Sequence, residues 1–231
     1  MEWPLPNKKG VRTMGFFSVE GPFNKFVSRI FDILLLNFLW VLFSLPIITI
    51  GASTVAAYSV AIKMVDDKEG YVGRSFVKAF RENLRQGIIL GLITIGAAYI
   101  VYLNFALFNA IESNPMIILI IGILAGVYFL FSLLYAFPLI ARYKNSLLQT
   151  LRNSMEISIK YFVRTMMLLL VLALIIFIMF YNFVTMFFSI FVGPAFIILT
   201  ISTFALNIFQ KIEKDHDEAI IPQVKKRRKK Q

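Results

Sequence analysis

Residues 36–52 read LNFLWVLFSLPIITIGA, and this stretch decides how the chain enters a membrane. It lies within an apolar run over residues 30–62. A helix needs about 20 apolar residues to cross the hydrocarbon core, so the run is long for one crossing and short for two. Pro46 cannot continue a helix, and Gly51 suits a sharp bend. The stretch predicts a helical hairpin with limbs at 24–45 and 52–65.

The basic residues favour the hairpin because they form four separate groups, at 8–29, 63–85, 142–164 and 211–230. Together the groups hold all 24 Lys and Arg residues. Lys and Arg are enriched in the cytoplasmic loops of membrane proteins. A single crossing by residues 30–62 would place the second group outside, whereas a hairpin leaves every group inside. A re-entrant hairpin that stops short of the far face satisfies the charges equally well.

Composition places the whole chain in a membrane. The sequence is 58% hydrophobic and 16% charged, whereas soluble domains are about 45–50% apolar and about a quarter charged. Too little polar surface is present to cover a soluble globule of 231 residues. The net charge of +11 is therefore interpreted as an orientation signal, and no nucleic-acid partner is expected.

Further apolar stretches predict four more membrane segments. Two are residues 88–111 and 115–141. The third stretch has no charged residue from 165 to 210, enough for segments at 165–184 and 187–209. The predicted fold is all-α: a polytopic helix bundle with six segments in three hairpins and both termini cytoplasmic.

The rest of the chain is assigned to flanking regions. Residues 1–15 are predicted to be a disordered lead, and translation begins at either Met1 or Met14. Residues 16–210 form a single membrane domain, and residues 211–231 form a basic cytoplasmic tail. The tail ends in the run KKRRKK at 225–230. Beside a bilayer this run predicts contact with anionic headgroups, at about 1 kcal/mol per charge near the surface.

The two longer inner loops, 74–86 and 146–164, have the pattern of amphipathic helices. In the first, Phe76, Phe80 and Leu84 recur at every fourth position. The second has an apolar stripe of Leu148, Leu151, Met155, Ile159 and Phe162. Such helices either lie in the membrane interface or extend the spans themselves.

Enzymatic chemistry is excluded mainly by what the sequence lacks. The chain has no Cys, and its one His is His216 in the tail, so neither a thiolate or imidazole metal site nor a Ser–His pair is expected in the membrane. Asp32 is the only acidic residue in a predicted span, and Arg29, one turn earlier, is its expected partner. No Walker-type phosphate loop is present. We therefore expect no catalytic residues, no metal and no cofactor.

Two polar and aromatic patterns point to a family. The first is Asn37-x-x-Trp40 followed by Pro46-x-x-Thr49-x-Gly51, and the second is Phe76-x-x-x-Phe80-Arg81-x-Asn83. Over about residues 16–209 the chain resembles YesL-like bacterial integral membrane proteins. The resemblance makes these nine residues the candidate functional motif. It also implies the bacterial cytoplasmic membrane and an association with ABC-type carbohydrate uptake systems.

The sequence is compatible with three functions. The first is a non-enzymatic component or accessory of a carbohydrate uptake system, in contact with transporter subunits. The second is a small-molecule channel or carrier acting on its own, with Asn37 or Thr49 in its path. The third is a membrane scaffold.

Overall fold

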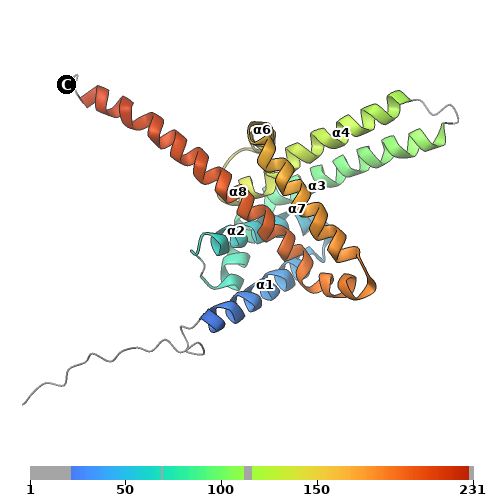
Figure 1. Cartoon of the computed structure of the whole chain (residues 1–231), viewed down its shortest axis with the longest axis horizontal. Helices are drawn as coiled ribbons and strands as arrows, with labels where there is room; N and C mark the ends of the chain where they lie inside the picture. Colours follow the sequence, from blue (N-terminus) through green and yellow to red (C-terminus); the bar gives the residue numbers. More distant parts are fainter. Residues whose placement is uncertain (1–21, 69, 112–115, 229–231) are drawn as a thin grey trace, which may run out of the picture.

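The computed structural model describes residues 22–68, 70–111 and 116–228, and this part of the chain is helical without any strand. Figure 1 shows the helices meeting near the centre and radiating from it. In chain order the elements are α1 (Pro22–Ser44), the short 3-10 helix η1 (Ile47–Thr49), α2 (Ile50–Val65), α3 (Val72–Ala110), α4 (Met116–Leu134), α5 (Ala136–Arg142), α6 (Leu147–Lys160), α7 (Phe162–Phe180) and α8 (Phe183–Arg228).

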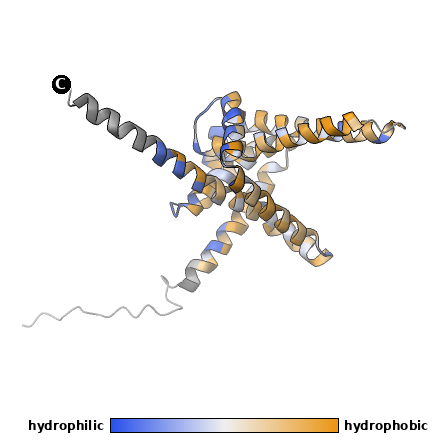
Figure 2. Ribbon diagram, turned by 45° about the horizontal axis from the view of Figure 1, so that its top comes forward, coloured by the Kyte–Doolittle hydropathy of each residue, from blue (hydrophilic) through white to orange (hydrophobic). Residues whose placement is uncertain are grey.

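Six helices of this part are long and apolar enough to cross a membrane, which confirms the predicted class of fold. They are α1, η1 with α2, α3, α4 with α5, α7, and α8. Figure 2 shows apolar residues along both projecting hairpins, α3–α4 and α7–α8, with most hydrophilic stretches at the other end of the molecule. We call that end, where Lys68, Arg142 and Glu213 lie, the basic end. Its cytoplasmic location stays a prediction.

Some predicted features lie outside the described residues. The lead at 1–15 does, and so does the predicted loop around residues 112–114. The backbone of α8 is described to Arg228, but its side chains only to Asp215, so contacts of the basic run at 225–230 stay a prediction.

The structure settles the two amphipathic loops differently. Residues 74–86 do not form a separate surface helix, because α3 runs without interruption for 39 residues from Val72 to Ala110. The helix passes through Gly87, which is buried against α2. Residues 147–160 do form a helix of their own, α6. Its N-cap is Ser146, whose hydroxyl accepts a hydrogen bond from the amide of Gln149.

The centre of the fold is α2, whose sequence is rich in small residues. Ala52, Ala56, Ala57 and Ala61 are fully buried. The helix packs against α1, α3, α5 and α8, and Figure 1 shows it at the point where the other helices meet. Small side chains let several helix backbones approach one axis, which is how helices pack inside membranes.

The turn between α1 and α2 does not reach the level of the α3–α4 tip. Gly51, at the start of α2, contacts α3 at Gly87 and Gly91. From Gly91, α3 continues to Ala110, about 28 Å further at the usual helical rise. Figure 1 shows this distal part of α3 and α4 projecting beyond the other helices. The turn at 46–51 is instead closer to the level of the α7–α8 turn, since Asn37 meets α8 seven residues after α8 begins.

Single-cysteine labelling tests this arrangement, and the native chain contributes no thiol of its own. Cysteines are placed at Ile48 in the α1–α2 turn, Tyr181 in the α7–α8 turn and Ile111 at the end of α3. With a membrane-impermeant maleimide, we expect position 111 to react fastest, and positions 48 and 181 to react more slowly and at similar rates. A cysteine at Leu170, within α7, is the unreactive control. Equal rates at 48 and 111 would contradict the arrangement.

Candidate functional site

Six of the nine motif residues meet where α1, η1, α2 and α3 pack together, and Asn37 of α1 contacts α8 instead. The indole of Trp40 donates a hydrogen bond to the hydroxyl of Thr54, at 3.1 Å. The backbone carbonyl of Trp40 accepts another from Ser53, at 2.9 Å. One residue of α1 is thus held twice by the first turns of α2. This pairing fixes the two limbs of the hairpin against each other.

The turn itself is closed by Thr49. Its hydroxyl lies 2.7 Å from the carbonyl oxygens of both Phe43 and Pro46. These carbonyls lie at and just beyond the C-terminal end of α1, where helical donors run out. Behind the turn, the ring of Phe43 makes edge-to-face contacts with Phe76 and Phe80 of α3, with centroids 5.4 and 4.9 Å apart. The second half of the motif therefore packs on the first.

Gly51 is required because α2 and α3 touch backbone to backbone at this position. A Cβ atom on Gly51 would lie 2.1 Å from the carbonyl oxygen of Gly87 and 2.7 Å from the Cα of Gly91. In return, a Cβ on Gly87 would lie 2.4 Å from the Cα of Ala52. The atoms named here belong to the backbone, so rotating a side chain could not relieve these contacts. The Gly87-x-x-x-Gly91 pattern is thus a packing face for α2.

Asn37 bonds to backbone groups of α8 beside Pro194, where the helical hydrogen bonds are interrupted. Pro194 has no N–H and cannot donate to the carbonyl of Ile190 one turn earlier. The Asn37 side-chain amide donates to that carbonyl at 3.1 Å. Its amide oxygen also accepts from the backbone N–H of Ala195, at 3.2 Å. Asn37 is only 3% exposed, so it links α1 to α8 inside the protein rather than lining an open path.

The other motif residues and Asp32 lie apart from this junction. Arg81 is exposed on α3, and Asn83 donates to the carbonyl of Ala79 in its own helix. Asp32 is half-buried on α1. Arg29 donates to the Met64 carbonyl at 2.8 Å and pairs with Asp67 at 2.9 Å, joining α1 to the end of α2. Its expected pairing with Asp32 stays a prediction.

A second interruption, between α4 and α5, is also bonded by side chains of another helix. The sequence analysis did not predict it. Pro138 lies in the first turn of α5, and a turn residue, Tyr135, separates α5 from α4. The N–H of Tyr135 donates to the hydroxyl of Ser154 on α6, at 3.2 Å. The carbonyl of Phe131 accepts from Ser154 and from Ser158, at 3.2 and 2.9 Å. A proline facing a helix with serines at four-residue spacing is the signal that could have indicated this contact.

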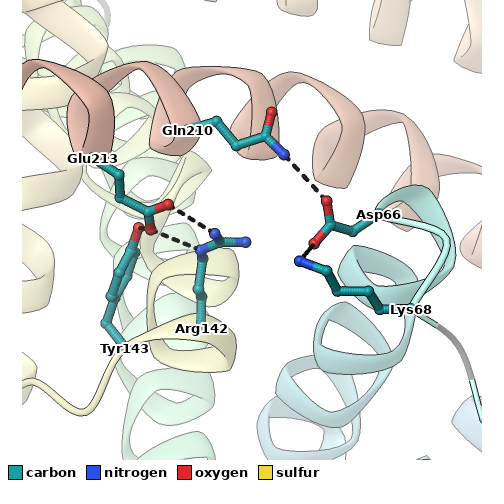
Figure 3. A network of polar contacts seen from close by, with 6 residues as sticks. All are labelled: Asp66, Lys68, Arg142, Tyr143, Gln210 and Glu213. Atoms are coloured by element: carbon teal, nitrogen blue, oxygen red, sulfur yellow. Dashed lines mark hydrogen bonds and ion pairs between the residues drawn. The ribbon is translucent and has the colours of Figure 1, made fainter.

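A polar network joins α5 to α8 at the basic end (Figure 3). Arg142, the last residue of α5, binds Glu213 with two parallel hydrogen bonds of 3.2 and 3.0 Å. The hydroxyl of Tyr143 donates to the same carboxylate. Burial, and then the neighbouring carboxylate, raise the pKa of Tyr143 to about 12. The phenol therefore keeps its proton and acts as a donor at neutral pH.

The same end ties α2 to α8. Asp66, the C-cap of α2, accepts a hydrogen bond from Gln210 of α8 at 3.2 Å and pairs with Lys68 at 2.7 Å (Figure 3). The hydrogen bond from Lys68 is the main cause that lowers the pKa of Asp66. Three helices are thus fastened where their apolar runs end.

A groove of about 640 Å³ lies beside this network, between α5, α6 and α8. Its floor is apolar and includes Leu139, Ile157 and Phe209, and its rim is polar. The polar lining residues are Tyr143, Asn145, Asn153, Glu156, Lys160 and Glu213. The described residues contain no group of three His, Cys, Asp or Glu placed to hold a metal ion. Chemically, the groove can bind a partly apolar group with hydrogen-bonding ends.

Comparisons with known proteins find a family and a relative, both without an assigned function. The family described as "Protein of unknown function, DUF624" matches residues 33–105, which include the Asn37–Gly51 junction and most of α3. A curated relative, uncharacterized protein YesL of Bacillus subtilis (strain 168), is 26% identical over 145 residues, covering 61% of this chain and 68% of that protein. The resemblance to the YesL-like family is confirmed. No solved structure matches the chain significantly.

Replacing Gly51 with Ala tests the contact between α2 and α3 in this YesL-like chain. The added methyl group would meet backbone atoms of Gly87 and Gly91, and overpacking of this kind costs about 1–3 kcal/mol. We expect Gly51→Ala to lower the midpoint of thermal unfolding in detergent, followed by circular dichroism. Gly96→Ala is the matched control, because a Cβ there has no neighbour within 4 Å. Equal stability of the two variants would contradict the contact.

A double-mutant cycle tests the link between Asn37 and Pro194. Asn37→Ala leaves the Ile190 carbonyl without its donor, at a cost of about 1–3 kcal/mol. Pro194→Ala restores a backbone N–H, which can bond to Ile190 as in an ordinary helix. We therefore expect Asn37→Ala to destabilise the wild type more than it destabilises the Pro194→Ala variant, in equilibrium unfolding from mixed micelles.

Asn104 provides the control for this cycle. Its amide donates to the carbonyl of Ile100 in its own helix, at 2.9 Å. Asn104→Ala should have the same small effect with and without Pro194. Full additivity of Asn37→Ala and Pro194→Ala would show that Asn37 has no role at the break.

Proposed function

We propose that this protein is a non-enzymatic component of the bacterial cytoplasmic membrane that binds a subunit of an ABC-type carbohydrate importer through the outer face of α6. It acts as an accessory that holds a partner at the basic end of the bundle. The multi-pass membrane fold and the YesL-like resemblance support the general assignment. The specific role rests on how α6 is packed.

The observation that carries the proposal is the orientation of α6. The helix buries a face of Thr150, Ser154, Ile157 and Ser158. The serines of that face bind backbone groups at the α4–α5 break. The ends of its apolar stripe lie outside the bundle, with Leu148 83% exposed and Ile159 58% exposed. Leu151 and Met155, between them, are half-buried against the protein. An apolar stripe on a helix needs a partner surface or the bilayer interface to cover it.

The exposed stripe also has the features of a specific contact surface. Tyr128 of α4 lines one side of a shallow groove of about 450 Å³, with Leu151 and Met155 along it. Arg152 and Glu156, paired at 3.2 Å, lie at its edge. An apolar centre with a charged rim is the arrangement found in protein interfaces. A partner with a short amphipathic helix fits such a groove.

A channel or carrier is the second candidate, and the groove at the basic end favours it. That groove, between α5, α6 and α8, is large enough for a small molecule. The neutral polar residues expected to line a path are used elsewhere, however. Asn37 and Thr49 are both hydrogen-bonded to backbone groups of their own chain. This makes the carrier the weaker reading, and a purely structural scaffold has no observation in its favour.

Site-specific crosslinking in native membranes tests the proposal. A photoreactive amino acid replaces Leu148 or Ile159 on α6, and Leu174 on α7 is the control, since it is also exposed, at 57%. We expect both α6 positions to crosslink an importer subunit identified by mass spectrometry, and position 174 to crosslink lipid alone.

A substitution provides the second measurement. Leu148→Asp should abolish co-purification of that subunit while leaving circular dichroism and gel-filtration behaviour unchanged, because the side chain makes little contact with its own protein. The proposal fails if crosslinks at 148 and 159 contain no transporter protein, or if Leu174→Asp disrupts co-purification equally. Sugar flux through the protein reconstituted alone would favour the carrier instead.

A further inference from the structure

Three cations converge on one aromatic ring at the junction of α6, α7 and α8. The Lys160 ammonium lies 5.6 Å from the centroid of the Tyr161 ring, and Arg164 and Lys211 each lie 5.9 Å from it. Any two of these charges are therefore within about 12 Å of each other. We call Lys160, Arg164 and Lys211 the cation triad.

The triad is assembled by the fold, because its members come from three helices. Lys160 ends α6, and Arg164 lies in the first turn of α7. Lys211 follows the apolar part of α8, at a change from apolar to polar residues that Figure 2 shows along this helix. Like charges repel one another, and salt screens this repulsion between exposed charges over about 8–10 Å. An anion shared among the three would replace the repulsion with attraction.

Within the described residues, no ion pair supplies that anion. The two nearby glutamates are engaged elsewhere: Glu213 binds Arg142 and Tyr143, and Glu156 binds Arg152. The Tyr161 ring gives each cation a weak attraction of the cation–π type. That attraction orients the three side chains and does not cancel their charge.

An apolar strip begins next to the triad and runs along α7. It is formed by Phe162, Val163, Met166, Met167 and Leu170, and borders a shallow depression of about 420 Å³ on the outer surface of the bundle. Val163 is 71% exposed and Leu170 69% exposed. A cationic centre above an apolar strip matches a phosphate group attached to an acyl chain.

We propose that the cation triad binds the phosphate of an anionic phospholipid, with one acyl chain of that lipid lying along α7 from Phe162 to Leu170. The site is separate from the basic run at 225–230, and it meets the apolar stripe that we propose for the protein partner only at Phe162. It defines a lipid position where three helices of the bundle meet.

The test is lipid binding to the full-length protein in detergent, measured by native mass spectrometry. Phosphatidylglycerol is compared with phosphatidylcholine of the same acyl chains and with inorganic phosphate. The site variant is Lys160→Gln, Arg164→Gln and Lys211→Gln together. The control variant, Arg74→Gln, Lys78→Gln and Arg81→Gln, removes three exposed charges from α3 and changes net charge equally.

We expect the wild type to retain phosphatidylglycerol in preference to phosphatidylcholine. Basic residues near a membrane surface contribute about 1 kcal/mol each, so losing three corresponds to roughly a hundredfold in affinity. The site variant should therefore lose at least tenfold, and the control variant less than twofold. Tyr161→Phe keeps the ring and should bind as the wild type does. If the triple variant does not fold, Arg164→Gln and Lys211→Gln are compared singly with Arg81→Gln, and each should weaken binding several-fold.

Three outcomes would overturn the proposal. Equal loss in the α3 control would mean that net charge alone attracts the lipid. Equal retention of phosphatidylcholine would mean that binding does not depend on the net negative charge of the lipid. Displacement of phosphatidylglycerol by millimolar inorganic phosphate would mean that the ligand is a free phosphate.

Discussion

A backbone carbonyl or amide released inside a membrane helix has no water to bind, and the tertiary structure depends on how this protein meets that constraint. Pro194 breaks the hydrogen-bond ladder of α8, and Asn37 of α1 bonds to the groups beside the break. Pro138 marks the break between α4 and α5. There Ser154 and Ser158 of α6 bond to the backbone groups beside the break. In both places a helix becomes dependent on a side chain from another helix. Contacts between residues far apart in the sequence thus form where the helical hydrogen bonds are interrupted.

The second requirement is close approach of backbones around α2. Hydrophobicity gives little attraction between helices in lipid, so packing has to come from tight contact. Gly51, Gly87 and Gly91 provide that contact between α2 and α3. Phe43, Phe76 and Phe80 then seal the edge of the same junction with their rings. The residues that carry the family resemblance are mostly explained by assembly of the hairpin, and this moves the functional question to the basic end.

At the basic end, the way α6 binds the α4–α5 break determines which of its side chains are exposed. Because α6 turns its serines toward backbone groups of α4 and α5, Leu148 and Ile159 at the ends of its apolar stripe stay exposed. The stripe is left for a partner or for the membrane interface. The same placement of α6 brings Lys160 next to Arg164 and Lys211. The proposed protein contact and the proposed lipid contact therefore share one structural origin, the way α6 is docked on α4 and α5.

The sequence by itself determined the all-helical membrane class and six apolar helices, because a crossing requires a local run of about 20 apolar residues, and such runs are visible in one dimension. It also located the hairpin through Pro46 and Gly51, whose backbone limits are local. Only the tertiary structure decided that α3 is one continuous helix, that Asn37 bonds beside Pro194 more than 150 residues away, and that Leu148 and Ile159 of α6 are exposed. Periodicity shows that a helix has two faces. Which face is buried depends on the unsatisfied groups that the neighbouring helix presents, and for α6 those groups are at Phe131 and Tyr135.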